Sequence, residues 1–596
     1  MSKPSSPLFS IVFILLLLIT AALPLKFGAL TGVPETGGMY PTNLWEAVFI
    51  AWPPMGFPLF AGALLVLTVA ISGRQAVFAG AGGAYAGLWL VLLGATLIGR
   101  INASTADFVY LQVIHLAGLS ALAVAAAWLL RQDPAWRGEL QAMVVIVAVV
   151  VALLGVQQYF FGFDETLAAL KSQAYGVSSP EVVAAFLRDR RIFSTFTLPN
   201  NLAGYLLLTL PLSLAVTWNF CARIEPVKVA RLVFLPLMAG LLGFVLLMTR
   251  SRAAFISLGA AVAVFLVMLP LARRYRWILM GMIGLGVAAG FVYIRYSHRG
   301  FSSLVARLDY NWVALKIFFH HPWAGTGWGD FFHDYMRLKT LASAEAPHTP
   351  HSFIMAYACE TGVVGLLAAG AVMLYPLYCG LRRFRSLPWR QLAAPEQAIL
   401  FGLTAWSFHS LLDVNLQSPG CTGTAILLAL CLLDGRELEW RFRLPAWLHS
   451  GAARLTARGL LLLLGLAALV GSMAMMRGDY HYAELNRVLR ECCNPDAVRR
   501  PTQEEVRRCF QAATKAMPWS PFPWGVYGRF LGAAGDWSGA ENCYREALRR
   551  SPERVSFYYE LGRLQQRIGQ REAAERNLRR ARELFPNHPG LRGDGE

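Results

Sequence analysis

The chain alternates between long apolar runs and shorter polar segments over most of its length. A run of about twenty apolar residues is long enough to cross a bilayer as an α-helix. Thirteen runs approach this length, at residues 8–28, 56–72, 76–98, 107–130, 140–161, 199–220, 231–249, 253–272, 277–295, 354–378, 397–414, 421–434 and 458–477. We therefore predict an all-α, polytopic membrane protein with about 12–13 transmembrane helices.

The pattern changes after about residue 478, where a charged, helix-forming sequence repeats with a period of 34 residues. Positions one period apart are Gly535 and Gly569, Ala540 and Ala574, Tyr544 and Leu578, Ala547 and Ala581, and Pro552 and Pro586. This period resembles that of tetratricopeptide repeats, whose stacked helix pairs form a solenoid with a concave surface for partners. We expect residues 478–596, here called the tail, to be an α-solenoid that docks a protein partner.

These patterns divide the chain into four parts. Residues 1–150 hold N-terminal transmembrane helices, and residues 151–435 form a transmembrane core with a large polar loop at 296–353. A basic segment and the last transmembrane helix occupy residues 436–477, and the repeats occupy residues 478–596.

Composition agrees with a membrane protein and limits what the positive charge can mean. Of the 596 residues, 56% are hydrophobic and 15% are charged, and the mean hydropathy is +0.45. The net charge of +18 comes largely from basic residues between the apolar runs and in the tail. This distribution is typical of topology signals, so we expect a lipid bilayer and no nucleic acid as partner.

The basic loops also indicate an orientation. With the N-terminus in the cytoplasm, the loops rich in arginine lie inside, at 131–137, 222–231, 272–276, 381–390 and 436–458. Basic loops are retained in the cytoplasm by the positive-inside rule. The same orientation places the 162–198 loop, the 296–353 loop and the tail on the opposite side of the membrane.

The nine cysteines include no CxxC pair and no spacing typical of a zinc site, so we expect no structural metal. Cys492, Cys493, Cys509 and Cys543 lie in the tail, where an oxidising compartment would allow disulfides. A bond between Cys509 and one of the vicinal pair is one alternative, and four free thiols are the other.

The most polar part of the core lies between Arg307 and Gly365. It contains HHPWAGTGWGDFFHDY at 320–335 and HTPHSFIMAYACETGVVG at 348–365, which are rich in histidine and aromatic residues. Loops held between rigid helices commonly carry binding and catalytic residues. We therefore place the candidate chemistry in this segment.

A resemblance to a known family runs through the same segment. His351 and Ser352, followed by nine residues, Gly362, two residues and Gly365, fit the His-[Asn/Ser/Gln]-x9-Gly-x-x-[Gly/Thr/Tyr] pattern of the O-antigen ligase and polymerase superfamily. The segments RRIFSTFTLPNNLAGYL, TRSRAAFISL and HHPWAGTGWGDF, which begin at residues 190, 249 and 320, resemble the same superfamily. The resemblance covers residues 150–435 and implies a bacterial inner-membrane glycosyltransferase. In the orientation given by the basic loops, the candidate site and the tail are then periplasmic.

Several arginines border apolar runs on the expected non-cytoplasmic face. Arginine near a span is costly, and its guanidinium binds phosphate oxygens through a bidentate fork. The alternative is that each side chain only extends to the lipid headgroups. The resemblance implies that such arginines bind the pyrophosphate of an undecaprenyl-linked glycan, and the residues that match are Arg252, Arg307, Arg250 and Arg191.

His351 is the candidate catalytic residue. Transfer requires an acceptor hydroxyl to lose its proton, and an imidazole can accept that proton near neutral pH. The alternative is a histidine at a helix start that is satisfied by backbone groups. His348, Glu360, Gly362 and Gly365 are candidate supporting residues. His348 and His351 form an HxxH pair without an evident third ligand, so we expect neither a metal nor another cofactor.

Four further features have structural interpretations. We expect Glu360 to pair with an arginine or a histidine, and Asp413 to pair with His409 in its own segment. Asn200 is expected to cap a helix. The GTGWGD segment indicates a tight turn rather than a phosphate-binding loop, because neither a lysine nor a helix start follows it.

The resemblance implies transfer of a glycan from undecaprenyl pyrophosphate to an acceptor, which could be lipid A core, a polysaccharide or a protein. Ligase, polymerase and protein O-oligosaccharyltransferase activities share these motifs. A transporter or flippase of lipid-linked sugars is an alternative from another class, although it should place ionisable residues along a path near the membrane midplane. A scaffold that acts only through the repeats would leave His351 and the arginines without a role.

Overall fold

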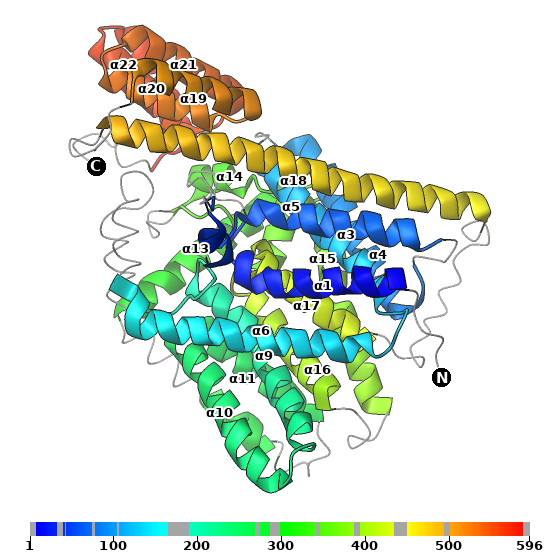
Figure 1. Cartoon of the computed structure of the whole chain (residues 1–596). Helices are drawn as coiled ribbons and strands as arrows, with labels where there is room; N and C mark the ends of the chain where they lie inside the picture. The colour runs from blue at the N-terminus through cyan, green and yellow to red at the C-terminus, as the bar shows by residue number, and fades with distance from the viewer. Residues whose placement is uncertain are drawn as a thin grey trace.

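The computed structural model describes residues 7–31, 40–41, 43–49, 51–73, 78–103, 107–164, 190–268, 275, 277–282, 284–285, 298–340, 346–386, 394–433, 450–493 and 501–587. These residues form helices and no strand, which confirms the all-α prediction. Figure 1 shows a bundle of long helices with a separate group of short helices at the C-terminal end of the chain.

Nine helical stretches among the described residues are long and apolar enough to cross a membrane. They are α1 (Pro7–Lys26), α3 (Phe57–Ile71) with the preceding 3-10 turn (Pro54–Gly56), α4 (Gly80–Gly99), α5 (Asp107–Leu129), α6 (Trp136–Gln157), α9 (Pro199–Cys221), α10 (Val227–Met248), α15 (Phe353–Ser386) and α18 (Gly451–Cys493). Each of them overlaps a predicted span. A short helix, α2 (Leu44–Phe49), precedes α3.

The other four predicted spans do not form helices of that length in the described residues. Three of them correspond to the shorter helices α11 (Arg252–Met268), α16 (Ala394–Ser410) and α17 (Pro419–Leu433). The run at 277–295 lies largely outside the described residues. Every residue of α17 is buried, because α1, α5, α9 and α16 surround it. An apolar helix in such a position forms the centre of a bundle, so its composition reflects burial in protein.

The segment predicted as a loop at 296–353 is largely helical. It contains α13 (His298–His320) and α14 (Phe331–Leu338), and α13 packs against α15. The apolar side chains Ala306, Tyr310, Val313, Ala314 and Ile317 of α13 are buried. They recur at intervals of three and four residues, which is the period of one helix face. The polar positions between these apolar residues concealed the helix in the sequence, and the placement of this segment between membrane spans stays a prediction.

The tail begins within a helix rather than after one. Helix α18 has 43 residues, packs against α3 and α5, and continues without interruption past the expected boundary at 477. At 1.5 Å per residue it is about 65 Å long. Figure 1 shows it in yellow, running from the edge of the bundle to the C-terminal helices.

Five short helices follow α18. They are α19 (Gln503–Ala516), α20 (Phe522–Ala533), α21 (Trp537–Arg550), α22 (Val555–Arg567) and α23 (Arg571–Leu584), and each packs against the next. Gly535 and Gly569, one 34-residue period apart, follow α20 and α22 with φ of 87° and 78°. A residue without Cβ adopts this left-handed conformation easily. The two turns are therefore equivalent, while the assignment to tetratricopeptide repeats stays a prediction.

All nine cysteines are free thiols in the structure. Of the two alternatives for the tail, the structure therefore has the four free thiols at Cys492, Cys493, Cys509 and Cys543, rather than a disulfide to Cys509.

Candidate active site

Asp413, in the turn that follows α16, joins three distant parts of the chain. Its Oδ2 accepts hydrogen bonds from Arg307 Nη2 at 3.1 Å and from Asn200 Nδ2 at 2.5 Å. Its Oδ1 accepts from the backbone N–H of Val414 at 2.9 Å and lies 3.8 Å from His351 Nδ1. Only 1% of the Asp413 side chain is exposed. A buried carboxylate persists when it is paired and hydrogen-bonded in this way.

Arg307 extends from α13 and is held by two hydrogen bonds. Its Nη2 donates to Asp413, and its Nη1 donates to the backbone carbonyl of Leu412 at 2.7 Å. The side chain remains 28% exposed. The guanidinium is therefore fixed in orientation from one side and accessible from the other, which suits binding of an anionic group.

His351 lies two residues before the start of α15. Its ring lies on that of Tyr310 from α13, with centroids 5.6 Å apart and planes at 30°. Because Nδ1 is the nitrogen near Asp413, the tautomer with a proton on Nδ1 is favoured. The other nitrogen, Nε2, is then left with a lone pair that can accept a proton.

Arg191 connects this cluster to the turn between α10 and α11. Its Nη2 donates to Asn200 Oδ1 at 2.9 Å, and its Nε donates to the carbonyl of Thr249 at 2.9 Å. The next residue, Arg250, and the first residue of α11, Arg252, are exposed. Among the described residues the guanidinium groups of these two arginines make no hydrogen bond or ion pair, although the backbone amide of Arg250 donates to the carbonyl of Leu247. The structure thus joins Arg191 and Arg307 to His351 and leaves Arg250 and Arg252 beside this cluster.

Two of the sequence-based interpretations were wrong at this point. Asn200 does not cap α9, whose N-cap residue is Leu198; its side chain bridges Arg191 and Asp413 instead. Asp413 pairs with Arg307 rather than chiefly with its neighbour His409, whose Nδ1 contacts Asn415 Nδ2 at 2.8 Å. The signal that could have found Asp413 was an acidic residue at the end of an apolar run.

Backbone strain concentrates around the same cluster. Within the described residues, the non-glycine residues with positive φ are Arg190, Ser194, Arg250 and His351. Such conformations cost on the order of 1–3 kcal/mol each and persist where surrounding structure imposes them. For the 190–194 segment that structure includes Gln158, whose Oε1 accepts the amides of Phe193 and Ser194.

The remaining supporting residues shape the backbone near the site. Glu360 is buried, and its Oε1 accepts from the amide of Phe331 at 3.3 Å. Glu360 therefore holds the start of α14 and, among the described residues, does not pair with an arginine or a histidine as we had expected. His348 stacks on Phe332 of α14 with centroids 4.8 Å apart. At Gly365, a Cβ would lie 1.8 Å from the hydroxyl oxygen of Thr361.

Comparison with known proteins bears on this same region. Residues 237–370 match the family model for O-antigen ligase. No curated protein matches the chain. The match to the O-antigen ligase family supports the superfamily resemblance and suggests a membrane glycosyltransferase of polysaccharide biosynthesis. Together with the apolar helices it suggests a multi-pass membrane protein.

The O-antigen ligase match includes Arg250, Arg252, Arg307 and His351 and ends within α15. It leaves out both Arg191 and Asp413. The contacts described above extend the candidate site to these two residues, since both reach it from segments outside the matched residues.

Gly362 introduces a kink in α15 within the O-antigen ligase match. Its φ is 65° and its ψ is −162°, and the backbone of Trp323 and Ala324, just before the GTGWGD turn, lies beside it. Val363 N donates to the carbonyl of Pro322 at 2.8 Å, and Gly327 N donates to that of Glu360 at 2.9 Å. The predicted turn therefore fixes α15, the helix that begins two residues after His351.

Replacing Gly362 by alanine should lower the melting temperature of the purified protein. Positive φ costs a non-glycine residue about 1–2 kcal/mol, and a Cβ here would lie 2.4 Å from the backbone of Trp323. Gly370→Ala, in the same helix but with open space around it, is the matched control and should not lower the melting temperature. Equal melting temperatures for the two variants would contradict this account of the kink.

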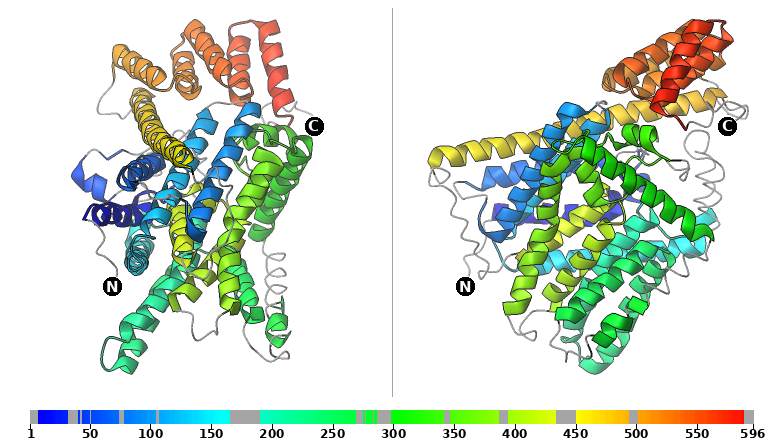
Figure 2. Two further views of the ribbon diagram at one scale, coloured as in Figure 1. Left: turned by 90° about the vertical axis from the view of Figure 1, so that its right-hand side faces the viewer. Right: turned by 180° about the vertical axis from the view of Figure 1, so that it is seen from behind.

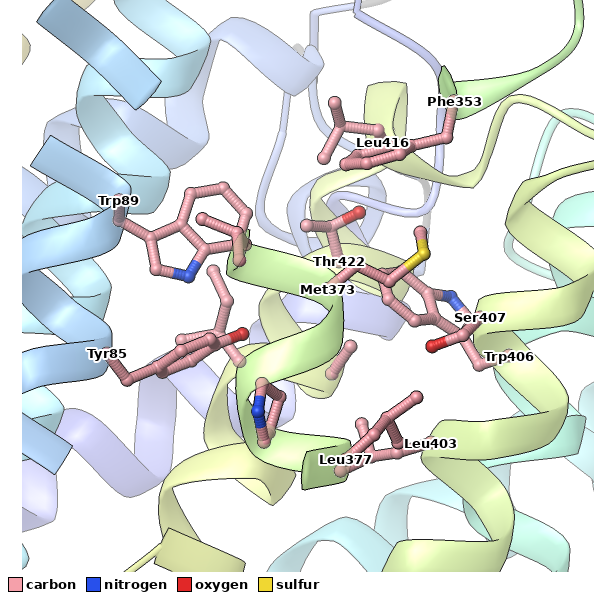
Figure 3. Close-up of a pocket in the computed structure, with 14 residues that line it drawn as sticks. Tyr85, Trp89, Phe353, Met373, Leu377, Leu403, Trp406, Ser407, Leu416 and Thr422 are labelled. Carbon is pink, nitrogen blue, oxygen red and sulfur yellow. The ribbon is translucent and has the colours of Figure 1, made fainter. Parts of the chain in front are cut away.

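A small apolar cavity lies within the bundle near these residues (Figure 3). Phe353, at the start of α15, and Leu416, three residues after Asp413, are among its lining residues. Its volume of about 20 Å³ is sufficient for roughly one water molecule. The cavity is too small for a sugar or a lipid chain, so the candidate site is the polar cluster itself.

In the part of the chain that the structure describes, no three His, Cys, Asp or Glu side chains are grouped as metal ligands. The cluster at Asp413 instead combines one carboxylate with arginine, asparagine and histidine, which are groups that bind anions and transfer protons.

Proposed function

We propose that this protein transfers a glycan from undecaprenyl pyrophosphate to an acceptor hydroxyl at the periplasmic face of the bacterial inner membrane, as an enzyme of the O-antigen ligase type. The observation that supports it best is the cluster at Asp413. There a buried carboxylate orients an accessible guanidinium and lies 3.8 Å from the imidazole of His351. Such a cluster combines a pyrophosphate-binding group with a proton acceptor.

In the proposed reaction the acceptor hydroxyl oxygen attacks the anomeric carbon of the donor glycan. His351 Nε2 takes the hydroxyl proton as the new carbon–oxygen bond forms. The bond between the anomeric carbon and the pyrophosphate oxygen breaks, and undecaprenyl pyrophosphate leaves with the electron pair. Direct attack inverts the anomeric configuration. Neither a nucleotide sugar nor a metal is required, because the pyrophosphate is itself the leaving group.

The charges around the cluster suit the proposed reaction. Arg307 and Arg191, with Arg250 and Arg252 nearby, balance the charge that develops on the leaving pyrophosphate. Asp413 Oδ1 lies 3.8 Å from His351 Nδ1, so its carboxylate is placed to pair with the imidazolium that forms when Nε2 takes the hydroxyl proton.

The acceptor distinguishes the members of the proposed class. Lipid A core would make the protein a ligase, a growing glycan would make it a polymerase, and a protein would make it an O-oligosaccharyltransferase. A lipid-linked sugar flippase is the alternative from another class. The described ionisable residues favour a transferase over a flippase, because they meet at helix ends rather than along a path through the bundle.

Transfer by the purified protein tests the proposal. The protein is mixed with an undecaprenyl-pyrophosphate-linked glycan and with lipid A core, oligosaccharide or protein acceptors, with and without EDTA. We expect one acceptor to be glycosylated, undecaprenyl pyrophosphate to be released, and EDTA to have no effect. Movement of the donor across vesicles without any transfer would support the flippase instead.

The proposed orientation makes a separate prediction. A reporter enzyme fused to the C-terminus should be active when the reporter requires the periplasm and inactive when it requires the cytoplasm, because the basic loops retain the opposite face inside. Fusion of the same reporters within the 381–390 loop provides the control and should give the reverse result. Cytoplasmic activity of the C-terminal fusion would place the candidate site on the wrong face for the donor.

A further inference from the structure

The last two helices of the tail share one hydrophobic core with the helices that carry the candidate site. Figure 2 shows the red C-terminal helices next to the green helices of the 298–340 segment. The buried members of this core are Ala306, Tyr310, Val313, Ala314, Ile317, Phe331, Tyr335, Met336, Cys359, Val555, Ala581, Leu584 and Phe585. They come from α13, α14, α15, α22, α23 and the residue that follows α23. A continuous core of this kind is typical of elements that form one structural unit.

Polar contacts fix the same interface. Glu553, just before α22, forms an ion pair with Arg337 of α14, with Oε1 and Nη2 2.6 Å apart. These side chains are 24% and 32% exposed, so solvent screens the pair only in part. At the end of α14, the backbone carbonyl of Lys339 accepts from Asn587 Nδ2 at 3.0 Å. The tail therefore contacts α14 at both ends of the interface.

Two chains of aromatic contacts lead from this interface to His351. Tyr335 of α14 meets Tyr310 edge-on at 5.5 Å, and the ring of Tyr310 lies on that of His351. In the second, the guanidinium of Arg554 lies 5.6 Å from the ring centroid of Phe332, which stacks on His348. The first route therefore ends at the proposed base, and the second ends at His348, three residues before it.

Helix α14 depends on these contacts for its own order. It has eight residues, fewer than an isolated helix needs to be stable in water. Four of them, Phe331, His333, Tyr335 and Met336, are buried. Burial, and then the Arg554 guanidinium, lowers the pKa of His333 to about 4, so this ring is neutral near pH 7. The neutral ring of His333 therefore adds no charge that would compete with the ion pair between Glu553 and Arg337.

We propose that the tail is a part of the transferase site, in which Glu553 and Arg554 act as positioning residues. They hold α14 against α13, and α14 in turn fixes Tyr310 and His348, which set the orientation of His351. The inference rests on the proposed function. It predicts that weakening the tail interface lowers turnover while the donor still binds, because the donor is held by the arginines of the core.

An exchange of charges tests the inference in the full-length protein. Arg337→Glu and Glu553→Arg are made singly and together, and assayed with an undecaprenyl-pyrophosphate-linked glycan and the acceptor used by the wild type. Each single variant should lower kcat about tenfold, since small displacements of a catalytic group have large effects on rate. KM for the donor should change by less than about twofold. The double variant restores the pair and should recover at least half of the lost rate.

Two further variants complete the design. Glu575 and Arg579 form an ion pair at 3.4 Å on the exposed surface of α23, so Glu575→Arg is the matched control and should keep wild-type kcat. Glu553→Gln keeps a hydrogen bond to Arg337 and should lower kcat by a smaller factor with an unchanged melting temperature, even where charge reversal disrupts folding.

The outcomes separate the two proposals. Wild-type kcat in Arg337→Glu and Glu553→Gln, or a double variant no better than the single ones, would overturn the role of the tail. A rise in donor KM without a fall in kcat would overturn it as well. Absence of transfer by the wild-type protein would instead refute the proposed function.

Discussion

Replacing His351 by alanine should abolish glycan transfer while the lipid-linked donor still binds. The arginines that contact the pyrophosphate in the proposed site remain in place, whereas the proton of the acceptor hydroxyl loses its acceptor. General-base catalysis contributes about 10²–10⁴-fold to a rate, so a loss in this range is expected. The measurement is single-turnover transfer together with equilibrium binding of the donor to the same variant.

Acidification gives an independent test of the same role. An imidazolium cannot accept a proton, so wild-type transfer should fall on acidification as His351 becomes protonated. His320→Ala is the control, because the exposed His320 ring bonds the carbonyl of Lys316 in its own helix at 2.9 Å. Loss of donor binding in His351→Ala, with intact folding, would make His351 a pyrophosphate ligand instead.

The helical bundle could be predicted from the sequence because a membrane span is a local feature. Its length and composition are set by the bilayer, and the overlap of the nine long helical stretches with predicted spans follows from that constraint. The central helix α17 shows where the rule is incomplete. Burial by neighbouring helices and exposure to lipid both select apolar residues, so composition alone does not distinguish them.

The candidate site was predictable in part. The difference between the residues that were predicted and those that were missed has a physical cause. His351, Gly362 and the arginines lie in segments with recognisable spacing. Asp413 is 62 positions after His351, and its role depends on how Arg307 of α13 meets the turn after α16, which no local pattern encodes. Asn200 was misinterpreted for a related reason, since a polar residue at a helix start has a local explanation that competes with a distant partner.

The tail is a larger example of a role that depends on contacts distant in the sequence. Its 34-residue period indicated stacked helices and therefore a docking role alone. The period does not reveal which face of the stack is already occupied. Val555, Leu584 and Phe585 pack against α13 and α14, so part of the tail is committed to the core of the protein and is not available to a partner.

Asp413→Asn should have an effect on transfer comparable to that of the His351 variant. The substitution keeps the size of the side chain but removes the charge that Arg307 and His351 share. The NH₂ group of the asparagine can also face the N–H of His351 Nδ1 or of Arg307. Both groups would then be hydrogen-bond donors, and no hydrogen bond could form between them. Loss of the carboxylate that orients a catalytic histidine lowers rates by about 10²–10⁴-fold in comparable arrangements. Turnover and donor affinity of the variant are the measurements.

Unlike His351→Ala, Asp413→Asn should also weaken donor binding, because it releases the Arg307 guanidinium from one of its two anchors. The hydrogen bond from Arg307 Nη1 to Leu412 remains, so the arginine keeps part of its orientation and the loss of affinity should be incomplete. Asp133→Asn, in the 131–137 loop outside the cluster, is the control and should behave as the wild type. A variant that retains full turnover would show that the cluster at Asp413 only stabilises the fold. One that loses donor affinity but not turnover would assign Asp413 to pyrophosphate binding alone, and His351 would then act without an orienting carboxylate.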